Sequence, residues 1–416
     1  MSIAFAEIPG CRVCGKTTLV PCVDIGRQYL ASIFPTDLSY RSTLHPYPLE
    51  LVLCAGPGAC GLLQLRYEFD LSGMYEAYPY QSSTNPSMRP VLEDVAAAGR
   101  GAVDLKPGDV VLDIGCNDAT MLSMLADRGL TLCGIDAAQN IEPVFDDPSL
   151  HLSRGLFTAA RFDSLGVARA RLIFSIAMFY HLGKPVEFSA DVAACLAPDG
   201  VWIVQMAYLP TMLEANMYDN IVHEHAGYYT VHSLQAVMQR AGLELYDVEL
   251  NDVYGGSYRA FIQHAGGPRA HTSRLATVLA GEQRAALDRP ETYQAFAARV
   301  AATRDDLRQL LDRLKTSGAV TWIYGASTKG GTIAQYCGIT SDDIPFAADT
   351  NPFKWGKYLI GANIPIVTEA ALRAARPDYL LALPYSFIDG FLAREAALVA
   401  SGSRFILPLP NVSIRP

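Results

Sequence analysis

The stretch DVVLDIGCNDATMLSML, residues 109–125, decides the fold class of this chain. Its first half is an apolar strand that reaches Asp113, Gly115 lies in the turn that follows, and the second half has the pattern of an amphipathic helix. LCGIDAAQN, residues 132–140, supplies a second strand that ends at Asp136. This order of elements predicts a Rossmann-like α/β domain whose ligand binds beyond the carboxyl ends of the strands.

The composition of the first turn indicates which cofactor this domain binds. A dinucleotide fold would carry G-x-G-x-x-G, whereas this turn has one glycine followed by Cys116 and Asn117. A single glycine leaves little room for a pyrophosphate, and Asp113 would repel one, but an acidic residue suits the cationic amino-acid moiety of S-adenosylmethionine. We therefore predict that Asp113, Gly115 and Asn117 contact S-adenosylmethionine and that Asp136 accepts hydrogen bonds from its ribose. A turn that serves packing alone is the alternative.

Two further apolar stretches continue this domain. ARLIFSIAMFYH (170–181) and GVWIVQMAY (200–208) are predicted strands, with a helix around residues 186–196 between them. Because ligands lie beyond the carboxyl ends of such strands, we expect Ala177 to contact the cofactor and His181 to reach the same crevice.

DNIVHEHAGYYT, residues 219–230, places two histidines around one glutamate. On a helix His223 and His225 would face different sides and could not share a metal ion, whereas on a strand they would share one face with Glu224 opposite. Polar core residues are the alternative. The segment closely follows the strand that ends near Tyr208, so it can reach the crevice of His181, and this convergence favours catalysis.

A second strand–turn–helix begins at AVTWIYGASTKGGT, residues 319–332. Its turn offers backbone N–H groups, hydroxyls and a cation at a helix N-terminus, which together favour a phosphate group. We predict that Tyr324, Ser327, Lys329 and Asp349, the last at the end of the next strand, contact the substrate. The spacing is not that of a Walker A motif, and a packing turn is again the alternative.

Two pairs of cysteines near the N-terminus predict a metal site. Cys11 and Cys14 form a C-x-x-C, and Cys54 and Cys60 enclose a Gly-Pro-Gly turn. Four thiolates suit tetrahedral zinc, and because no ligand-free position is evident the site would be structural. The wide second spacing leaves Cys22 as a possible substitute for Cys60, and unrelated buried thiols are the alternative.

Size and charge restrict the classes of function. The chain has 416 residues, of which 50% are hydrophobic, with a formal net charge of −9. The negative charge argues against nucleic acids and anionic membranes as partners. We find no apolar run long enough to cross a membrane and no signal segment, so we expect a cytoplasmic protein. The predicted parts are a zinc-binding domain (1–75), a methyltransferase domain (76–272), a helical linker (273–318) and a C-terminal Rossmann-like domain (319–416).

Several motifs together carry a resemblance across nearly the whole chain. They are CRVCG (11–15), YPYQSSTNPSM (78–88), VLDIGCNDAT (111–120), HEHAGYYT (223–230), GGSYR (255–259), YGASTKGGT (324–332) and DTNPFKWGKY (349–358). With these motifs the chain resembles the C-methyltransferases of deoxysugar biosynthesis, which act on TDP-4-keto sugars such as the precursors of tetronitrose, mycarose and noviose. The resemblance implies a zinc domain, a central S-adenosylmethionine domain and a C-terminal Rossmann-like domain.

The resemblance also implies roles for individual residues. His225 would be the catalytic base with Glu224 and His181 beside it, and we expect His223 to contact the substrate. Tyr78 and Tyr80 would form a lid over the cofactor and the sugar. Two departures from the family pattern concern the pocket: members usually have Tyr where Val222 stands, and Glu near the position of Gln205.

Three hypotheses follow. The leading one is an S-adenosylmethionine-dependent C-methyltransferase that acts beside the ketone of a TDP-linked 4-keto-deoxysugar, working as a monomer or a small homo-oligomer. The second is an N- or O-methyltransferase acting on a nucleotide sugar or another small metabolite. The third is a non-catalytic nucleotide-binding scaffold, which the coexistence of His181, Glu224 and His225 with the cofactor turn disfavours.

Overall fold

The strand predicted before Gly115 is β6 (Val110–Ile114), which lies inside a seven-stranded sheet. The computed structural model describes residues 3–71, 73, 80–84 and 88–416. The order of the strands in this sheet is β12 (Leu243–Asn251), β13 (Ser257–His264), β10 (Leu196–Ala207), β9 (Ala170–Ile176), β6, β7 (Thr131–Asp136) and β8 (Leu150–Arg154). β13 runs antiparallel to both of its neighbours, and the pairs from β10 to β8 are parallel.

The order of the strands fixes where a ligand can bind. The chain passes from β6 outward to β7 and β8 and then returns to β9 on the other side of β6. The connections after β6 and β9 therefore diverge, and they leave a crevice at the carboxyl ends of these two strands. This crevice lies between the turn of Gly115 and the segment that leads to His181.

The helix predicted after the glycine turn is shorter than its pattern indicated. It spans only α3 (Thr120–Ser123) and is followed by the 3-10 turn η3 (Ala126–Arg128). Local side-chain hydrogen bonds compete with helix propagation here: the Thr120 hydroxyl and backbone N–H both donate to Asp118, and the Ser123 hydroxyl donates to the Thr120 carbonyl. The other helices of this lobe are α2 (Met88–Ala102), α4 (Ala159–Asp163), α5 (Pro185–Cys195), α6 (Leu209–Glu214) and α7 (Val231–Arg240).

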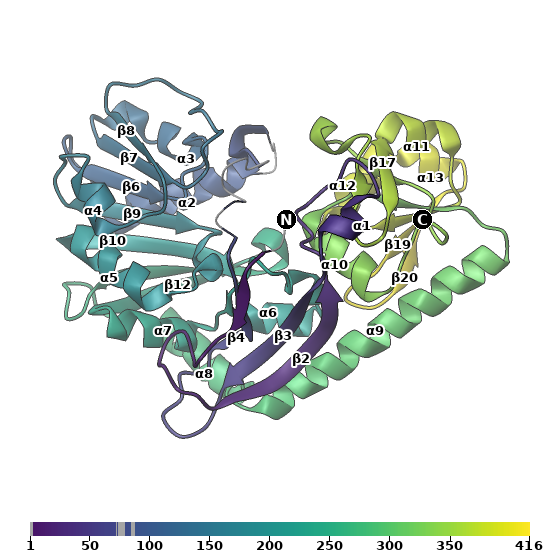
Figure 1. The fold of residues 1–416 in the computed structure, drawn as a ribbon. Coiled ribbons are helices and arrows are strands. Elements are labelled where there is room, and N and C mark those ends of the chain that lie inside the picture. Colours follow the sequence, from purple (N-terminus) through teal and green to yellow (C-terminus); the bar gives the residue numbers. More distant parts are fainter. Residues whose placement is uncertain (1–2, 72, 74–79, 85–87) are drawn as a thin grey trace.

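The N-terminal residues form a small sheet that includes a strand from far along the chain. Its order is β11 (Gly227–Tyr228), β4 (Leu63–Leu65), β3 (Tyr47–Cys54) and β2 (Leu19–Gln28), and β1 (Phe5–Glu7) pairs separately with β5 (Tyr67–Phe69). β11 follows the His-Glu-His triplet directly, so this triplet is fastened to the N-terminal sheet. In Figure 1, β2 and β3 lie below the gap between the two larger lobes.

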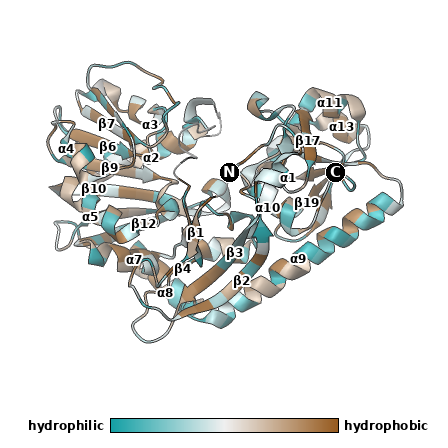
Figure 2. Ribbon diagram, in the orientation of Figure 1, coloured by the Kyte–Doolittle hydropathy of each residue, from teal (hydrophilic) through white to brown (hydrophobic). Residues whose placement is uncertain are grey.

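The predicted linker consists of two helices, α8 (Ser273–Arg284) and α9 (Pro290–Thr316). α9 runs beneath the N-terminal sheet and the C-terminal lobe (Figure 1) and packs along β2. Its apolar face is buried, with Tyr293, Phe296 and Leu307 inaccessible to solvent, while its outer face is hydrophilic (Figure 2). α9 thus joins the N-terminal sheet and the C-terminal lobe through one core.

The C-terminal lobe repeats the layout of the first. Its order is β16 (Tyr358–Leu359), β17 (Ile364–Thr368), β15 (Ala347–Asp349), β14 (Thr321–Tyr324), β18 (Tyr379–Ala382), β19 (Arg404–Leu407) and β20 (Ser413–Arg415), and only its edge pairs are antiparallel among the described strands. Its helices are α10 (Thr328–Tyr336), α11 (Glu369–Ala375), α12 (Ile388–Arg394) and α13 (Ala396–Ala400). Within the described part of the chain, no helix is long and apolar enough to cross a membrane.

Glu282 of α8 joins the linker to the first lobe. Its carboxylate is 5% exposed and accepts hydrogen bonds from the backbone N–H groups of Val231 and His232 at 2.6 and 2.9 Å. It also accepts one from the Tyr208 hydroxyl at 2.9 Å. Glu282 therefore caps the N-terminus of α7, where a negative charge is favoured by the helix dipole.

We predict that Glu282→Gln lowers the free energy of unfolding by about 1–3 kcal/mol, because buried donors lose a charged acceptor. Urea unfolding followed by circular dichroism measures the change. The exposed Glu142, replaced by Gln, is the matched control and is expected to change it by less than about 0.5 kcal/mol. Equal stability of the Glu282→Gln variant and the parent would contradict the assignment.

Candidate active site and zinc centre

The turn after β6 is held open by backbone geometry. Gly115 has φ +80°, and a Cβ atom there would come within 3.3 Å of the Met178 side chain. Asn117, Ala119 and Ala177 are also left-handed, with φ of 54°, 61° and 53°. Such residues cost about 1–3 kcal/mol each and gather at functional sites. The predicted cofactor residues Gly115, Asn117 and Ala177 thus have left-handed backbone just after the carboxyl ends of β6 and β9.

Asp136 stabilises this turn from the end of β7. Its two carboxylate oxygens accept hydrogen bonds from the backbone N–H groups of Asn117 and Ala138, both at 2.7 Å. A carboxylate has further lone pairs, so Asp136 can still accept from ribose hydroxyls. Asp113 is buried beside it, and burial, followed by the charge of Asp136, raises the pKa of Asp113 to about 8. A cationic amino group there would favour the charged form of this buried carboxylate.

The segment predicted to form a lid is tied to the cofactor turn. The backbone N–H of Ser82 donates to Asn117 at 2.9 Å, and that of Ser83 donates to Asp118 at the same distance. The Asn117 amide in turn donates to the carbonyl oxygen of Tyr80 at 3.1 Å. The Tyr80 side chain is 37% exposed. Tyr78 lies outside the described residues, so its role stays a prediction.

The His-Glu-His triplet lies in a turn, neither on a strand nor on a helix, and the turn separates its two histidines. His223 is 3% exposed, its ring Nε2 lies 3.3 Å from the carbonyl oxygen of Tyr47, and its ring packs edge-on against Phe69 at 4.9 Å. His225 instead stacks on His181, with ring centroids 5.4 Å apart and planes 21° apart. Of the two, the structure brings only His225 to the crevice, and the expectation that His223 contacts the substrate has no support from its position.

A backbone carbonyl fixes the tautomer of His225. Its Nδ1 lies 2.8 Å from the carbonyl oxygen of Asn220, which can only accept, so Nδ1 carries the proton and Nε2 has a free lone pair. The Tyr228 hydroxyl donates to the same carbonyl oxygen at 3.1 Å. The carbonyl oxygen of Asn220, rather than the Glu224 carboxylate, therefore orients the His225 ring.

Burial keeps His225 neutral. It is the largest cause that lowers the pKa of His225 well below its ordinary value, and repulsion from a protonated His181 and from Lys329 lowers it further. Burial also lowers the pKa of His181 to about 4. Both imidazoles are thus uncharged near neutral pH.

Glu224 is a buried carboxylate without a well-formed hydrogen bond. Neither oxygen is accessible to solvent, and neither has a partner of normal hydrogen-bond geometry among the described residues. Burial raises the pKa of Glu224, although the hydroxyl of Ser32, from the N-terminal part of the chain, is near enough to favour the charged form. Since buried polar groups are normally paired, this carboxylate is open to a donor from a ligand.

The C-terminal lobe contributes Lys329 to this site. α10 packs against the 3-10 turn η5 (Tyr218–Asn220), and the Tyr385 hydroxyl donates to Asp219 at 3.1 Å. Lys329 stands in the first turn of α10, within electrostatic reach of both Asp219 and His225. The predicted phosphate contact therefore lies beside the candidate base.

The other residues predicted in the C-terminal turn have structural partners. The Ser327 hydroxyl caps α10 by accepting from the Gly330 N–H at 3.0 Å. Asp349 accepts from Ala326 N and Lys354 Nζ at 2.9 and 3.0 Å, in a position equivalent to that of Asp136. Tyr324 is 1% exposed, and its hydroxyl donates a hydrogen bond to Glu395 and accepts one from Arg394. The position of Tyr324 therefore gives no support for a substrate contact.

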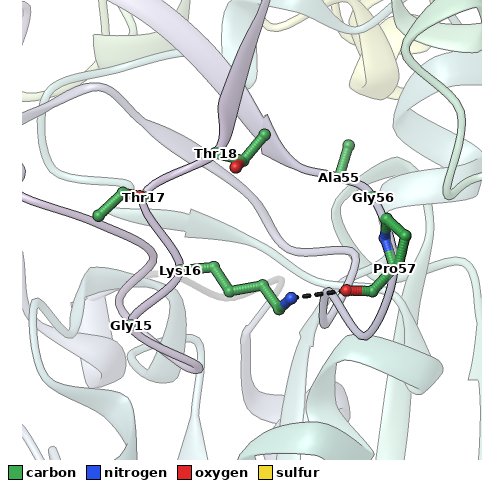
Figure 3. A pocket seen from close by; sticks show the side chains of 7 residues that line it. All are labelled: Gly15, Lys16, Thr17, Thr18, Ala55, Gly56 and Pro57. Atoms are coloured by element: carbon green, nitrogen blue, oxygen red, sulfur yellow. Dashed lines mark hydrogen bonds between the residues drawn. The ribbon is translucent and has the colours of Figure 1, made fainter.

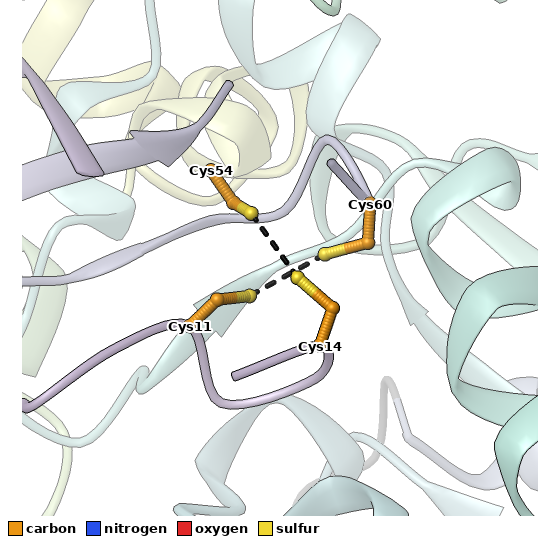
Figure 4. Close-up of side chains that lie close together, drawn as sticks. All are labelled: Cys11, Cys14, Cys54 and Cys60. Atoms are coloured by element: carbon orange, nitrogen blue, oxygen red, sulfur yellow. Dashed lines mark hydrogen bonds between the residues drawn. The ribbon is translucent and has the colours of Figure 1, made fainter. Parts of the chain in front are cut away.

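The four predicted cysteines come together at the edge of the N-terminal sheet. The Sγ atoms of Cys11 and Cys60 are 3.4 Å apart, as are those of Cys14 and Cys54, and all four lie within 4.8 Å of one another (Figure 4). Tetrahedral zinc, with Zn–S bonds of about 2.3 Å, separates its sulfurs by about 3.8 Å, so the cluster fits the metal. Cys22 lies apart on β2, where its thiol donates to the Val20 carbonyl.

The two cysteine loops are joined by a lysine. The Lys16 ammonium donates to the carbonyl oxygen of Pro57 at 2.5 Å, across a shallow pocket lined by both loops (Figure 3). Gly56 and Gly58 of the second loop have φ of +99° and +65°. These left-handed residues allow the wide loop between Cys54 and Cys60 to return to the metal site.

Sequence reasoning missed Asn220, Asp219 and Ser32. Asn220 acts through its backbone carbonyl, which has no signature in the sequence. Ser32 reaches Glu224 from nearly two hundred positions away, as the numbering shows, and nothing local marks it. Asp219 lies in the quoted stretch beside Asn220, and an acidic residue next to the triplet was a signal that could have been used.

Comparisons with known proteins agree with this geometry. A zinc binding domain family matches residues 11–75, a methyltransferase domain family matches 86–248, and the C-methyltransferase C-terminal domain family matches 252–410. The C-methyltransferase NovU of Streptomyces niveus is 30% identical over 406 residues, which cover 97% of this chain and 96% of NovU.

Among solved structures, the CcbJ methyltransferase of Streptomyces caelestis is similar at 15% identity and a TM-score of 0.33, over 47% of this chain and 96% of CcbJ. Magnesium protoporphyrin IX methyltransferase of Synechocystis, solved with S-adenosylhomocysteine, is similar at 14% identity and a TM-score of 0.33, over 42% of this chain and 82% of that one.

The fold, the cysteine cluster and the matches to the family models define an S-adenosylmethionine-dependent methyltransferase with a structural zinc centre. The predictions of enzyme class, cofactor and metal are thereby confirmed. The chain belongs to the deoxysugar C-methyltransferase family.

We predict that Asp136→Asn weakens S-adenosylmethionine binding by about 1–3 kcal/mol, because an amide cannot accept from two backbone N–H groups and a ribose. Calorimetric titration measures the affinity. Asp349→Asn changes the equivalent carboxylate of the C-terminal lobe and is expected to leave cofactor affinity unchanged. An equal loss in both variants, or no loss in Asp136→Asn, would refute the assignment.

Proposed function

We propose that this enzyme methylates the carbon beside the ketone of a TDP-4-keto-deoxysugar, in the biosynthesis of a natural-product sugar. The observation that carries the proposal is the state of His225, which is neutral, has a free Nε2 and stacks on His181. O- and N-methylation start from a lone pair, whereas a C–H bond beside a ketone first needs a base.

His225 has the properties of that base. Its Nε2 lone pair accepts the proton, the C–H electron pair moves into the C–C bond, and the charge of the resulting enolate rests on the former ketone oxygen. A base held within about 2.6–3.2 Å of its proton typically supplies 10²–10⁴-fold. The Nδ1 bond to Asn220 keeps the ring in one orientation throughout, so little reorganisation is needed.

Two groups beside His225 suit the enolate oxygen. Lys329 brings a positive charge from the C-terminal lobe, and a neutral His181 can donate a ring N–H. One well-aimed donor in such a site is worth roughly 2.7–4 kcal/mol. The unpartnered carboxylate of Glu224 is suited to a hydroxyl or amino substituent of the sugar.

When bound, S-adenosylmethionine supplies the electrophilic methyl group that the substrate carbon attacks. On the protein side, Asp113 is suited to the amino group of the cofactor and Asp136 to its ribose. Gly115 leaves room for the cofactor at the carboxyl end of β6. These residues orient the cofactor, and zinc takes no part in the transfer.

The remaining substrate contacts follow from the C-terminal lobe and from the family pattern. Ser327, Lys329 and Asp349 border the turn that we assign to the nucleotide. Val222 is 3% exposed and stands where family members usually carry Tyr. If that Tyr touches the sugar elsewhere in the family, this pocket holds a different substituent.

A panel of TDP-4-keto sugars with ¹³C-methyl S-adenosylmethionine tests the proposal. We expect a product that is heavier by one methyl group, with a carbon-attached methyl signal in ¹H–¹³C spectra. A methyl signal with the shift of an O- or N-methyl group would favour the second hypothesis. Failure of every TDP-4-keto sugar, with turnover of another metabolite, would refute the substrate class.

The pH dependence of kcat/KM for the sugar, at saturating cofactor, tests the state of His225. Because the pKa of His225 is lowered, the base stays neutral until the pH falls through that lowered value. We expect no acidic limb near the ordinary histidine pKa of about 6.5. Circular dichroism at each pH controls for unfolding, and an acidic limb at or above that value would contradict the geometry.

A further inference from the structure

The zinc centre carries a charge that the protein has to offset. Zinc with four thiolates has a net charge of −2, and three of its ligands, Cys11, Cys54 and Cys60, are at most 4% exposed. Burying such a charge is costly unless hydrogen-bond donors or cations surround it. The Val13 N–H already lies 3.5 Å from the Cys11 sulfur, which is one weak donor.

Within the described part of the chain, two further donors beside this centre are buried without hydrogen-bond partners. The Nε–H of Arg12, which stands between the first two cysteines, has no acceptor, and neither does the hydroxyl of Tyr229, whose side chain is 2% exposed. Arg12 lies within electrostatic reach of Cys11 and Tyr229, and Tyr229 within reach of Cys11 and Cys60. A buried donor that lacks an acceptor destabilises the fold, so two of them at one metal site point to the thiolate sulfurs of the zinc-bound state as their acceptors.

The other cation near the centre is already occupied. The Lys16 ammonium donates to the Pro57 carbonyl on the solvent side of the two loops (Figure 3). The terminal nitrogens of Arg12 likewise have acceptors: they donate hydrogen bonds to the carbonyl oxygens of Leu65 and Tyr67 at 2.6 and 3.1 Å. The Nε–H of Arg12 and the Tyr229 hydroxyl remain available.

Tyr229 belongs to the segment that carries the candidate base. It follows β11, whose residues Gly227 and Tyr228 pair with Gln64 and Leu63 of β4. Its ring packs against Phe179 at a centroid distance of 5.4 Å, and Phe179 begins the 3-10 turn that ends at His181. Tyr229 thus lies between the cysteine cluster and the segments that carry His181 and His225.

We propose that Arg12 Nε–H and the Tyr229 hydroxyl donate hydrogen bonds to the zinc thiolates. We also propose that Tyr229 thereby couples zinc binding to the position of the segment that carries Glu224 and His225. The positioning role rests on the proposed function, whereas the hydrogen bonds to the thiolates do not. Arg12 acts in parallel, because its guanidinium donates to the carbonyl oxygen of Leu65, the last residue of the β4 strand that pairs with β11. Both are positioning residues.

Cobalt(II) in place of zinc tests the hydrogen bonds to the thiolates in the full-length protein. We expect Tyr229→Phe, which keeps the ring and removes the donor, to shift the thiolate-to-cobalt charge-transfer bands. Competition with a chromophoric chelator should show zinc affinity lowered about 10–100-fold, the usual effect of losing a group that hydrogen-bonds a metal ligand. Arg12→Lys, which keeps the charge but loses the Nε–H, should change the bands in the same way.

Tyr258→Phe is the matched control. Its hydroxyl is also buried and unpartnered, but its electrostatic neighbours are Glu282, Tyr229 and Tyr208, none of them a zinc ligand. We expect it to leave the cobalt spectrum and the zinc affinity unchanged. Spectra and affinities of Tyr229→Phe that match the parent would overturn the proposal, as would equal shifts in Tyr229→Phe and Tyr258→Phe.

Hydrogen–deuterium exchange tests the positioning role of Tyr229 without any substrate. Removal of zinc should accelerate amide exchange in residues 221–230 in the parent, and Tyr229→Phe should show part of this acceleration with zinc bound. Residues 113–120 of the cofactor turn should exchange as before. Unchanged protection of 221–230 after removal of zinc would overturn the positioning role, whatever sugar the enzyme methylates.

Discussion

The hydrogen bond from His225 Nδ1 to the carbonyl oxygen of Asn220 is the interaction on which the site depends. It leaves Nε2 as the acceptor and sets the plane in which His225 stacks on His181. Three parts of the chain hold this segment. β4 pairs with β11 on one side, the 3-10 turn η4 (Phe179–His181) supplies His181 on another, and α10 of the C-terminal lobe packs on η5.

Each part also supplies chemistry of its own. The first lobe presents the cofactor crevice at the switch between β6 and β9, where strained backbone at Asn117 and Ala177 is held by Asp136 and by the neighbouring strand. The C-terminal lobe repeats this turn, but Lys354 already occupies its carboxylate, Asp349, and the lobe brings Lys329 to the base instead. The same architecture thus serves the cofactor in one lobe and, as we propose, the substrate in the other.

Local chemistry was readable from the sequence, and long-range packing was not. β6 follows from an apolar run closed by the Gly115 turn, β7 from the apolar run that ends at Asp136, and the cysteine cluster from paired thiols. The short α3 was missed because side-chain hydrogen bonds around Asp118 compete with the helix. The separation of His223 from His225 depends on a turn fixed by β11 pairing, which no periodicity reveals.

The central claim is that His225 removes the proton beside the ketone, and solvent deuterium exchange tests it most directly. With a TDP-4-keto sugar and S-adenosylhomocysteine in deuterium oxide, the parent enzyme should incorporate deuterium at the carbon beside the ketone. His225→Asn should bind both ligands with parental affinity and exchange at least about 10²-fold more slowly. Exchange at the parental rate in His225→Asn would contradict the account and would assign the base to another residue.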